Sequence, residues 1–314
     1  MDQVLDALRA TSDASRLRIL CLLEFGELTV SELVTILSQS QPRVSRHLKI
    51  LLDSGLLSRF REGSWVFHRL NAEGLARQLV GLVPKNDLVR IQDLSRLHEI
   101  EKSRACAAEH YFAKYAPEWD RLRQLDVDED QVAKAVCEML PVTKSQRLLD
   151  LGTGTGRMLE VLGPHVGEAL GVDKSCEMLA VARSNLKKWE LENCQLRQGN
   201  ILTLPLEMGK FDVVVLHQVL HFLERPWMAI SEALRLLKTD GRLLIVDLAP
   251  HHIEDLRDQH AHRRLGFSDT DVREWLADQG FTCETIRHLS GSNKTDGLNV
   301  TIWLAKQTAP SKLI

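Results

Sequence analysis

The alternation of short apolar segments with helical segments, from Leu148 to about Ala305, limits the fold of this chain more than any other feature. Five apolar segments alternate with helical stretches, which predicts parallel strands joined by crossovers in a doubly wound sheet. Two further segments follow each other across residues 290–298 without a helix, so we expect an antiparallel hairpin at the end of that sheet. The predicted strands are Arg147–Leu151, Glu168–Val172, Cys194–Gln198, Phe211–Leu216, Arg242–Leu248, Thr282–Leu289 and Asn299–Lys306.

The first of these strands runs into a turn with three glycines in the spacing G-x-G-x-G: Gly152, Gly154 and Gly156. Glycines at this point permit a tight turn and a close approach of the backbone to a ligand. The dinucleotide pattern G-x-G-x-x-G does not fit, because Arg157 and Leu159 occupy the third positions, and there is no P-loop lysine. Asp150, just before the glycines, would repel a pyrophosphate and favour a cationic group.

Two further motifs follow the second and third predicted strands. Asp173 ends the second strand and is suited to bind both hydroxyls of a ribose. Asn200 and Ile201 follow the third strand and offer an amide and an apolar edge to an adenine. Because the carboxyl ends of parallel strands form a common ligand-binding edge, we expect a nucleoside site there. The alternative for Asp173 is an ordinary surface carboxylate at a strand end.

The motifs along this part of the chain, in their order, resemble those of class I S-adenosylmethionine-dependent methyltransferases. They are the glycine turn with Asp150, Asp173, Asn200, and the segments Phe211–His221 and Leu237–Ile245. The resemblance covers about residues 110–306 and implies a Rossmann-like fold that binds S-adenosylmethionine or S-adenosylhomocysteine. The cofactor-binding residues that it implies are Asp150, Gly152, Thr153, Gly154, Gly156, Asp173, Lys174, Asn200, Ile201, His217 and Tyr115.

The resemblance also implies roles for single residues. The glycine turn passes the methionine portion, Asn200 and Ile201 frame the adenine, and His217 lies beside the sulfonium. Otherwise His217 begins a helix without touching a ligand, and His221 is a packed structural histidine. The histidine-rich run Asp247–His262 offers a general base or a metal ligand, or else forms a polar loop and a solvated helix.

An aromatic cluster precedes the glycine turn. Tyr111, Tyr115 and Trp119 repeat at four-residue intervals, with Phe112 beside them, and on a helix these side chains share a face. Core packing is the common explanation of such a face. Aromatic rings also stabilise a sulfonium by cation–π contact, so we predict that the segment Phe112–Trp119 closes the pocket.

The first 83 residues show a different pattern of short helices followed by a hairpin. Asp13 is placed to cap one helix, and Thr29–Glu32 reads as a capping box that opens the next. Leu56–Arg61 and Ser64–Leu70 alternate around Glu62-Gly63, which indicates a β-hairpin. Helix-turn-helix followed by a hairpin is a winged-helix arrangement, whose second helix lies in the major groove of DNA.

Basic residues concentrate on the two elements that a winged helix offers to DNA. Between Gln41 and Arg69 there are six Arg or Lys and two acidic residues, a net charge of +4, whereas the whole chain carries −3. Local binding is therefore expected rather than nonspecific coating. The alternative is an ordinary solvated helix surface. The predicted DNA-binding residues are Gln41, Arg43, Ser45, Arg46, Lys49 and Arg61.

The segments Asp13–Leu20, Gln41–Leu51 and Arg61–Leu70 resemble the ArsR family of dimeric bacterial repressors over about residues 1–83. That family often senses metals through a Glu-Leu-Cys-Val-Cys box. Here the matching stretch is Glu27–Ser31, with hydroxyls in place of both thiols, and hydroxyls are poor ligands for soft metals. The predicted fifth helix, Asn71–Val83, carries no histidine either. We therefore expect no metal at these sites.

The predicted organisation is a winged-helix DNA-binding domain over 1–83, a helical linker and pocket lid over 84–120, and a methyltransferase-like domain over 121–314. The longest apolar runs are far shorter than the roughly 20 residues that span a bilayer, and no signal peptide is visible. Six scattered cysteines without a C-x-x-C pair fit a reducing compartment. We expect a cytoplasmic protein that does not bind membranes.

Three functions remain open at this point. The first is a homodimeric transcriptional regulator that binds double-stranded operator DNA and senses S-adenosylmethionine or S-adenosylhomocysteine. The second is an active methyltransferase of a small molecule, with the N-terminal domain regulating its own operon. The third and weaker one is a DNA-targeted methyltransferase acting on a nearby protein or base. The Asn/Asp-Pro-Pro-aromatic signature of base amino methylation is absent, and the cysteines do not match those expected for arsenite methylation.

Overall fold

The chain divides into two compact units, Met1–Cys106 and Ala107–Ile314, and each is described by itself. The computed structural model describes residues 2–62, 64–71, 75–119, 128–205, 210–290 and 298–307. Gly63 of the expected hairpin turn lies outside the described residues. The expected linker, 84–120, contains the boundary between the two units.

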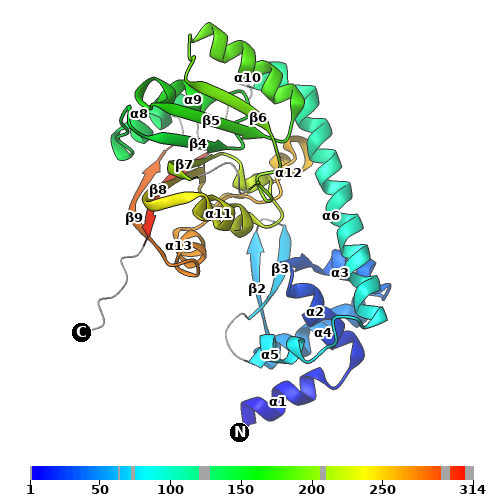
Figure 1. Cartoon of the computed structure of the whole chain (residues 1–314). Helices are drawn as coiled ribbons and strands as arrows, with labels where there is room; N and C mark the ends of the chain where they lie inside the picture. The colour runs from blue at the N-terminus through cyan, green and yellow to red at the C-terminus, as the bar shows by residue number, and fades with distance from the viewer. Residues whose placement is uncertain are drawn as a thin grey trace, which may run out of the picture. The chain divides into compact units, whose positions relative to one another are not determined.

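The N-terminal unit is a helix-turn-helix with a wing (Figure 1). Its elements are α1 (Asp2–Thr11), α2 (Ala14–Leu23), β1 (Leu28–Thr29), α3 (Val30–Leu37), α4 (Gln41–Asp53), β2 (Leu57–Glu62), β3 (Trp65–Leu70), α5 (Leu75–Gly81) and the first part of α6 (Leu88–Tyr115). The strands form an antiparallel sheet in the order β1-β3-β2. The winged-helix prediction is confirmed, and the sequence analysis did not anticipate the two-residue strand β1.

Local capping begins two of these helices as the sequence predicts. The Asp13 carboxylate accepts hydrogen bonds from the backbone N–H groups of Ser15 and Arg16 and so caps α2. Thr29 and Glu32 form a reciprocal capping box at the start of α3. Each such cap is worth about 1 kcal/mol, because it satisfies backbone donors that the first helical turn leaves unpaired.

Four arginine side chains hold the part of α6 before residue 106 to the helix-turn-helix. The contacts are Arg18 with Asp93, Arg90 with Glu24, Arg96 with the Ile36 carbonyl, and Arg104 with Glu32. The Arg18–Asp93 pair is bidentate, with N–O distances of 2.6 and 2.7 Å, and this geometry makes it the most directional of the four. The helix is therefore part of the N-terminal unit until residue 106.

The C-terminal unit is a doubly wound α/β domain with a seven-stranded sheet among its described residues (Figure 1). Its elements are the end of α6, η1 (Ala116–Glu118), α8 (Glu129–Met139), β4 (Arg147–Leu151), α9 (Arg157–Leu162), η2 (Gly163–His165), β5 (Glu168–Asp173), α10 (Cys176–Lys188), β6 (Cys194–Gln198), β7 (Phe211–His217), η4 (Leu220–Phe222), α11 (Pro226–Arg235), β8 (Leu237–Leu248), α12 (Asp255–His260), α13 (Asp269–Ala277), β9 (Phe281–Leu289) and β10 (Val300–Gln307).

The strand order is β6-β5-β4-β7-β8-β10-β9. The first five strands are parallel, and β10 is antiparallel to both β8 and β9. The predicted mostly parallel sheet with a terminal antiparallel hairpin is confirmed. β8 begins at Leu237 rather than Arg242, because Leu237 pairs with Phe211 before a register shift in β7.

Successive residues of the central strands enter two different apolar layers. Leu148 packs in the layer that includes α8, α9 and α10, while Leu149 packs in the layer of α11 and α13. Val213 and Val214 of β7 divide in the same way. Strands buried on both faces explain the near-continuous apolar runs of the sequence. Each buried leucine or valine contributes roughly 1.5–3 kcal/mol of transfer free energy.

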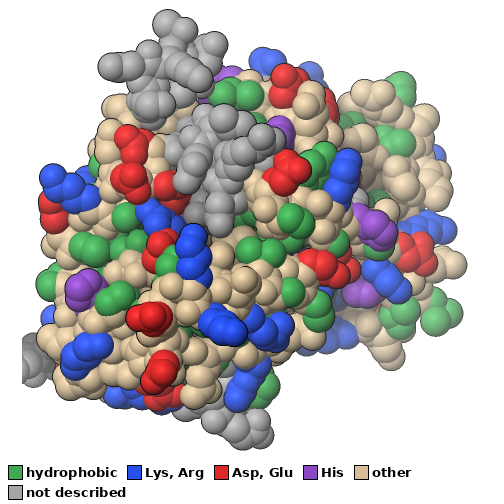
Figure 2. Space-filling model, turned by 90° about the horizontal axis from the view of Figure 1, so that it is seen from above, with side chains coloured by type: hydrophobic (Ala, Val, Ile, Leu, Met, Phe, Trp, Pro, Cys, Tyr) green, Lys and Arg blue, Asp and Glu red, His purple; other side chains and the backbone are tan. Residues whose placement is uncertain are grey.

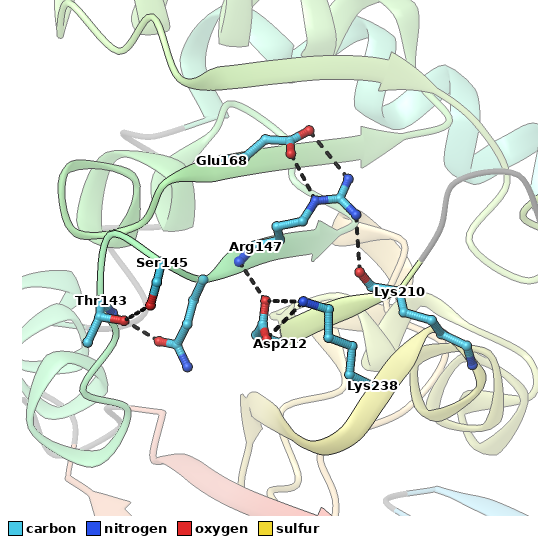
Figure 3. Close-up of polar contacts among 8 residues, drawn as sticks. Thr143, Ser145, Arg147, Glu168, Lys210, Asp212 and Lys238 are labelled. Atoms are coloured by element: carbon cyan, nitrogen blue, oxygen red, sulfur yellow. Dashed lines mark hydrogen bonds and ion pairs between the residues drawn. The ribbon is translucent and has the colours of Figure 1, made fainter.

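Charged residues join the amino ends of four strands (Figure 3). Arg147 of β4 pairs with Glu168 of β5 at 2.8 Å, and its backbone N–H donates to Asp212 of β7 at 2.9 Å. The Lys238 ammonium of β8 donates to both oxygens of Asp212. On the face seen in Figure 2, acidic and basic side chains are interspersed. No helix within the described ranges is long and apolar enough to cross a bilayer.

Candidate functional site

The second helix of the helix-turn-helix, α4, has one exposed face and one buried face. The predicted contacts Gln41, Arg43, Ser45, Arg46 and Lys49 are all exposed. Val44, His47, Leu48 and Leu51 are buried on the opposite face of the helix. Arg61 of β2 is exposed on the wing. The predicted arginine, lysine, glutamine and serine side chains of α4 are thus exposed. Exposure is what contacts with phosphates and bases require.

The glycine turn between β4 and α9 has the geometry that only glycine adopts readily. Gly152, Gly154 and Gly156 have φ of +75°, +53° and +93°. A Cβ atom on Gly152 would lie 2.5 Å from Cγ2 of Val219, so no larger side chain fits. Over Gly154, Nε1 of Trp119, at 4.0 Å, is the one atom of the described residues within 4 Å of such a Cβ. The backbone of Gly154 is therefore open to close approach by a ligand.

Asp173, at the end of β5, is bound to this turn. Its carboxylate accepts hydrogen bonds from the backbone N–H groups of Gly154 and Ser175, both at 2.9 Å. Burial raises the pKa of Asp173 above its ordinary value in spite of these bonds. Asp150 is fully buried at the end of β4 and accepts a 2.6 Å hydrogen bond from the Thr153 hydroxyl. Both carboxylates thus fix the shape of the turn.

The other predicted binding residues lie at the same edge in different environments. Asn200 is exposed, and its side-chain oxygen accepts the backbone N–H of Leu202, whereas Ile201 is 7% exposed and packs in the core. His217 ends β7 and is buried, with Nε2 4.0 Å from Glu129. These residues come together because β6, β5, β4 and β7 are neighbours in the sheet.

Two predicted residues are tied to the end of α6. The Lys174 ammonium pairs with Glu109 of that helix. The Tyr115 ring is half-buried, 4.8 Å from the ring of Tyr111, and the Lys114 ammonium lies 4.7 Å from its centre. Neither side chain is aimed at the glycine turn by a hydrogen bond within the described part of the chain.

Aromatic rings connect the end of α6 to the segment after β7. Trp119 lies beside Gly154, and its ring is 5.4 Å from Phe112 and 6.1 Å from Phe222 of η4. Phe112 and Phe222 meet edge-to-face at 4.8 Å. Such T-shaped pairs are favourable ring arrangements. The segment expected to close the pocket therefore lies beside the glycine turn after β4 and packs against η4, which follows β7.

A buried imidazole–carboxylate pair lies behind these rings. Nδ1 of His221 is 2.7 Å from Asp247, and both side chains are less than 5% exposed. Asp247, near the end of β8, also accepts the backbone N–H groups of Leu220 and Leu248. The sequence analysis favoured a packed structural role for His221 and did not join it to Asp247. The available signal was that Asp247 lies near the end of one predicted strand and His221 follows the end of the strand before it.

Other histidines surround this pair. The ring of His262 lies 4.3 Å from that of His221. Burial lowers the pKa of His262, and burial lowers the pKa of His251 to about 4, so both are neutral at pH 7. His260 shares a 2.8 Å hydrogen bond with the Tyr111 hydroxyl. Within the ranges that the structure describes, no three His, Cys, Asp or Glu side chains are grouped to hold a metal ion.

The chain leaves β7 through a strained residue. Gln218 has φ of +50°, a left-handed conformation that is uncommon for a residue other than glycine. Its backbone N–H donates to the Val246 carbonyl at 2.7 Å. This turn directs the chain into η4, where Leu220 and His221 reach Asp247.

Together, a helix-turn-helix unit with an exposed cationic helix and an α/β unit with a glycine cradle at its carboxyl edge define a DNA-binding fold joined to a nucleoside-binding fold. Residues 13–59 match the bacterial regulatory protein arsR family, and residues 142–292 match a methyltransferase domain family. The chain thus joins an ArsR-type helix-turn-helix domain to a class I methyltransferase domain.

Known relatives match the second of these domains. The uncharacterized methyltransferase YcgJ of Bacillus subtilis is 34% identical over 141 residues, covering 42% of this chain and 54% of that protein. Demethylmenaquinone methyltransferase of Listeria welshimeri is 30% identical over 148 residues, covering 45% of this chain and 62% of that protein. The solved structure of YcgJ superposes with a TM-score of 0.50 at 19% identity, over 57% of this chain and 99% of YcgJ.

A methyltransferase domain of this class implies binding of S-adenosylmethionine or S-adenosylhomocysteine. The residues present fit such a nucleoside. The open backbone at Gly154 is a cradle that a Cβ would narrow, and its φ of +53° favours glycine. The carboxylates at the ends of β4 and β5 suit a cationic amino acid portion and a ribose better than a pyrophosphate.

Proposed function

We propose that this protein is a DNA-binding transcriptional regulator whose methyltransferase domain binds S-adenosylmethionine or S-adenosylhomocysteine as a signal. The observation that carries the proposal is the single helix α6. Arg90, Arg96 and Arg104 bond the part of α6 before residue 106 to the helix-turn-helix. The last turns of α6 carry Tyr111 and Tyr115, which belong to the aromatic cluster of the C-terminal unit. In this proposal residues 84–120 serve as linker and lid.

The mechanism is thermodynamic linkage. A nucleoside that binds one conformation of the dimer more tightly shifts operator affinity by the ratio of its two affinities, and operator DNA shifts nucleoside affinity by the same factor. Couplings of this kind typically amount to about 1–3 kcal/mol, or 5- to 150-fold. The position of Trp119 beside Gly154 and its ring contact with Phe222 support the proposal that an occupied cradle changes the packing of the lid.

A homodimer is supported by exposed apolar side chains on the N-terminal unit. They are Val4, Leu5 and Leu8 of α1, with Leu82, Leu88, Val89 and Ile91 between the end of α5 and the start of α6. Clustered exposed leucine and valine side chains mark an association surface. A two-fold dimer would present two copies of α4 to the half-sites of a palindromic operator. The proposed setting is the cytoplasm.

Operator binding at fixed salt tests the signalling role. Fluorescence anisotropy of an operator fragment is measured with S-adenosylmethionine, with S-adenosylhomocysteine and with neither. At least one nucleoside is expected to change the Kd by about 5-fold or more. The Asp173→Ala variant is expected to bind operator normally without any response. Equal affinity under all three conditions contradicts the sensor role.

Arg46→Ala tests the DNA surface separately. Loss of one exposed cation on α4 is expected to weaken operator binding by about 1–3 kcal/mol if Arg46 contacts a base, or to lower the salt slope by about one if it contacts a phosphate. Calorimetry should find nucleoside affinity unchanged. Arg77→Ala, on α5, is the matched control for loss of a basic residue.

A second candidate function is methyl transfer to a small molecule, with the N-terminal domain regulating expression of its own operon. The observation that favours it is the His221–Asp247 pair at the nucleoside edge. Release of labelled methyl groups into small molecules of a lysate tests this function. The regulator and enzyme roles are compatible, because an intact cradle serves both.

A further inference from the structure

We propose that His221 is a catalytic base, positioned by Asp247, for a methyl acceptor that carries a phenolic hydroxyl on an aromatic ring. The inference rests on the proposed binding of S-adenosylmethionine at the glycine turn. It deepens the second candidate function by naming the residue that takes the proton and the class of acceptor.

The pair has the geometry of an oriented base. The Asp247 carboxylate is itself fixed by the backbone N–H groups of Leu220 and Leu248, at 2.9 and 2.8 Å. It lies 2.7 Å from Nδ1 of His221 and so holds the proton on that nitrogen. The other nitrogen, Nε2, is then the proton acceptor, and the side-chain hydrogen bond of His221 within the described residues is at Nδ1. This is the arrangement by which a carboxylate sets the tautomer of a catalytic imidazole.

The main chain around the base is equally constrained. The carbonyl of His221 accepts hydrogen bonds from the backbone N–H groups of Arg263 and Arg264, at 2.8 and 3.0 Å. His221 is 3% exposed, and its ring contacts Phe222 at 4.0 Å between centroids. A histidine fixed by both its ring and its backbone keeps one orientation, which a proton-transfer group requires.

The base lies at the edge where the proposed methyl donor binds. Val219, two residues before His221, packs against Gly152 of the glycine turn. On the other side, Trp119 lies beside Gly154 and contacts Phe222, whose ring is 4.0 Å from that of His221 at a tilt of 49°. Two independent sets of contacts therefore connect the turn to the imidazole, one through the main chain after β7 and one through the rings.

The walls indicate the class of acceptor. Phe112, Trp119, Phe222 and the neutral His262 pack edge-to-face in one mainly apolar cluster, an environment that suits an aromatic ring. A phenol has a pKa of about 10, as tyrosine does, and is a weak nucleophile at neutral pH until its proton is removed. A hydroxyl on such a ring therefore needs the base that the structure supplies.

The proposed step balances as follows. Nε2 of His221 takes the phenolic proton, and the oxygen forms a new bond to the methyl carbon of the donor. The carbon–sulfur bond breaks and leaves its electron pair on sulfur, giving S-adenosylhomocysteine and the aryl methyl ether. The positive charge that was on the sulfonium now resides on the imidazolium of His221, beside the Asp247 carboxylate, which stabilises it.

Several ionisable groups lie around the imidazole. Asp247 of β8 favours the charged form, while His251 and His262 interact unfavourably with it when charged. Burial keeps both of those histidines neutral above pH 5. Arg257 of α12, which also acts on both histidines, opposes a positive charge nearby.

The test uses 4-nitrocatechol, a phenol whose ionisation is visible in its absorption spectrum. The full-length protein is saturated with S-adenosylhomocysteine, so that no turnover occurs, and the bound dye is titrated with acid. Wild type is expected to lower the apparent pKa of the bound dye by about one unit, because the proton moves to His221. In His221→Gln the bound dye should titrate as it does in solution. His165→Gln, an exposed histidine on η2, is the matched control and should behave as wild type.

Methyl transfer gives a second measurement. With labelled S-adenosylmethionine and the dye as acceptor, His221→Gln should lose about 100-fold or more in kcat, the usual contribution of a general base. Raising the pH should restore part of this loss, because the dye then ionises unaided. Asp247→Asn should lower kcat and shift the pH profile with little change in the KM of the donor, which a purely structural role would not do.

Folding and donor binding are controlled by calorimetry with S-adenosylhomocysteine. Unchanged affinity in both variants shows that the fold is intact. Failure of the dye to bind, or an identical titration in wild type and His221→Gln, overturns the assignment of the base and acceptor. Failure of wild type to bind S-adenosylhomocysteine overturns the proposed function instead, and titration of the dye without nucleoside then decides the role of His221.

Discussion

The two ends of the parallel strands carry acidic residues in opposite surroundings. Near the amino ends, Asp212 accepts hydrogen bonds from the Lys238 ammonium and the Arg147 backbone (Figure 3). Burial opposes its ionisation, but these hydrogen bonds outweigh burial and hold the pKa of Asp212 below its ordinary value. At the carboxyl ends, the donors to Asp173 among the described residues are backbone N–H groups, and burial raises its pKa. Asp212 is thus paired with a cation at the amino edge, whereas Asp173 at the carboxyl edge has no cationic partner among the described residues.

The difference separates the edge that stabilises the sheet from the edge at which we propose that the nucleoside binds. At the amino edge, Arg147 pairs with Glu168 and Lys238 pairs with Asp212, each on a neighbouring strand, so these ion pairs stabilise the order of the strands. At the carboxyl edge the carboxylates of Asp173 and Asp247 hold loops and an imidazole in place. Variants at the two edges should therefore separate loss of ligand from loss of stability.

Asp173→Ala should have the largest effect on ligand binding. Loss of charged hydrogen bonds to a ribose is expected to lower the affinity for S-adenosylhomocysteine about 100-fold, at roughly 1.5–3 kcal/mol for each charged hydrogen bond. Titration calorimetry measures this change. Asp212→Ala, at the opposite edge, is the control and should bind the nucleoside as wild type does. Equal losses in the two variants would remove the distinction between the edges.

Gly152→Ala should destabilise the fold at the carboxyl edge. The new Cβ would lie 2.5 Å from Val219 on a residue with φ of +75°, and overpacking together with backbone strain costs about 2–3 kcal/mol. Urea denaturation followed by circular dichroism measures the free energy of unfolding. Gly55→Ala, with φ of +70° and nothing within 4 Å, carries the strain alone and should lose only about 1 kcal/mol.

The pH dependence of stability should differ between Asp212 and Asp173. The pKa of Asp212 is lowered on folding, so its contribution is present above 3.8 and is lost as the pH falls through the lower, folded value. Asp212→Asn should therefore cost about 1 kcal/mol at pH 7 and little at pH 3. The pKa of Asp173 is raised, so its charge destabilises the fold above that value, and Asp173→Asn should not destabilise at pH 7.

Glu168→Gln should have the smallest effect. The Arg147–Glu168 pair is partly exposed, with side chains 35% and 46% accessible, and solvent screening limits such pairs to about 0.2–1 kcal/mol. Denaturation at low and high salt should show the loss only at low salt. A loss that persists in high salt would mean that the pair does more for the sheet than an exposed ion pair does.

Elements fixed by neighbouring residues were predictable from the sequence. The cap at Asp13 and the capping box Thr29–Glu32 depend on residues two or three positions apart, and both form as expected. The strands were placed to within one residue at most ends, because buried parallel strands have distinct apolar runs. The early start of β8 at Leu237 was not predictable, since it depends on pairing with Phe211 across the sheet.

Contacts between distant residues were beyond the sequence. Arg18 and Asp93 are 75 residues apart, and nothing local in either segment indicates that they pair. His221 and Asp247 are 26 residues apart and meet only because β7 and β8 are neighbours. The predicted binding residues could be placed at one edge, because strand ends converge there. The bonding of Asp150 to Thr153 and of Lys174 to Glu109 needed the structure.

The left-handed conformation of Gln218 has a practical consequence for engineering. A residue with a Cβ at φ of +50° holds roughly 1 kcal/mol of backbone strain, which asparagine tolerates better than glutamine. Gln218→Asn is thus a single-residue route to a more heat-resistant protein that leaves the apolar layers untouched.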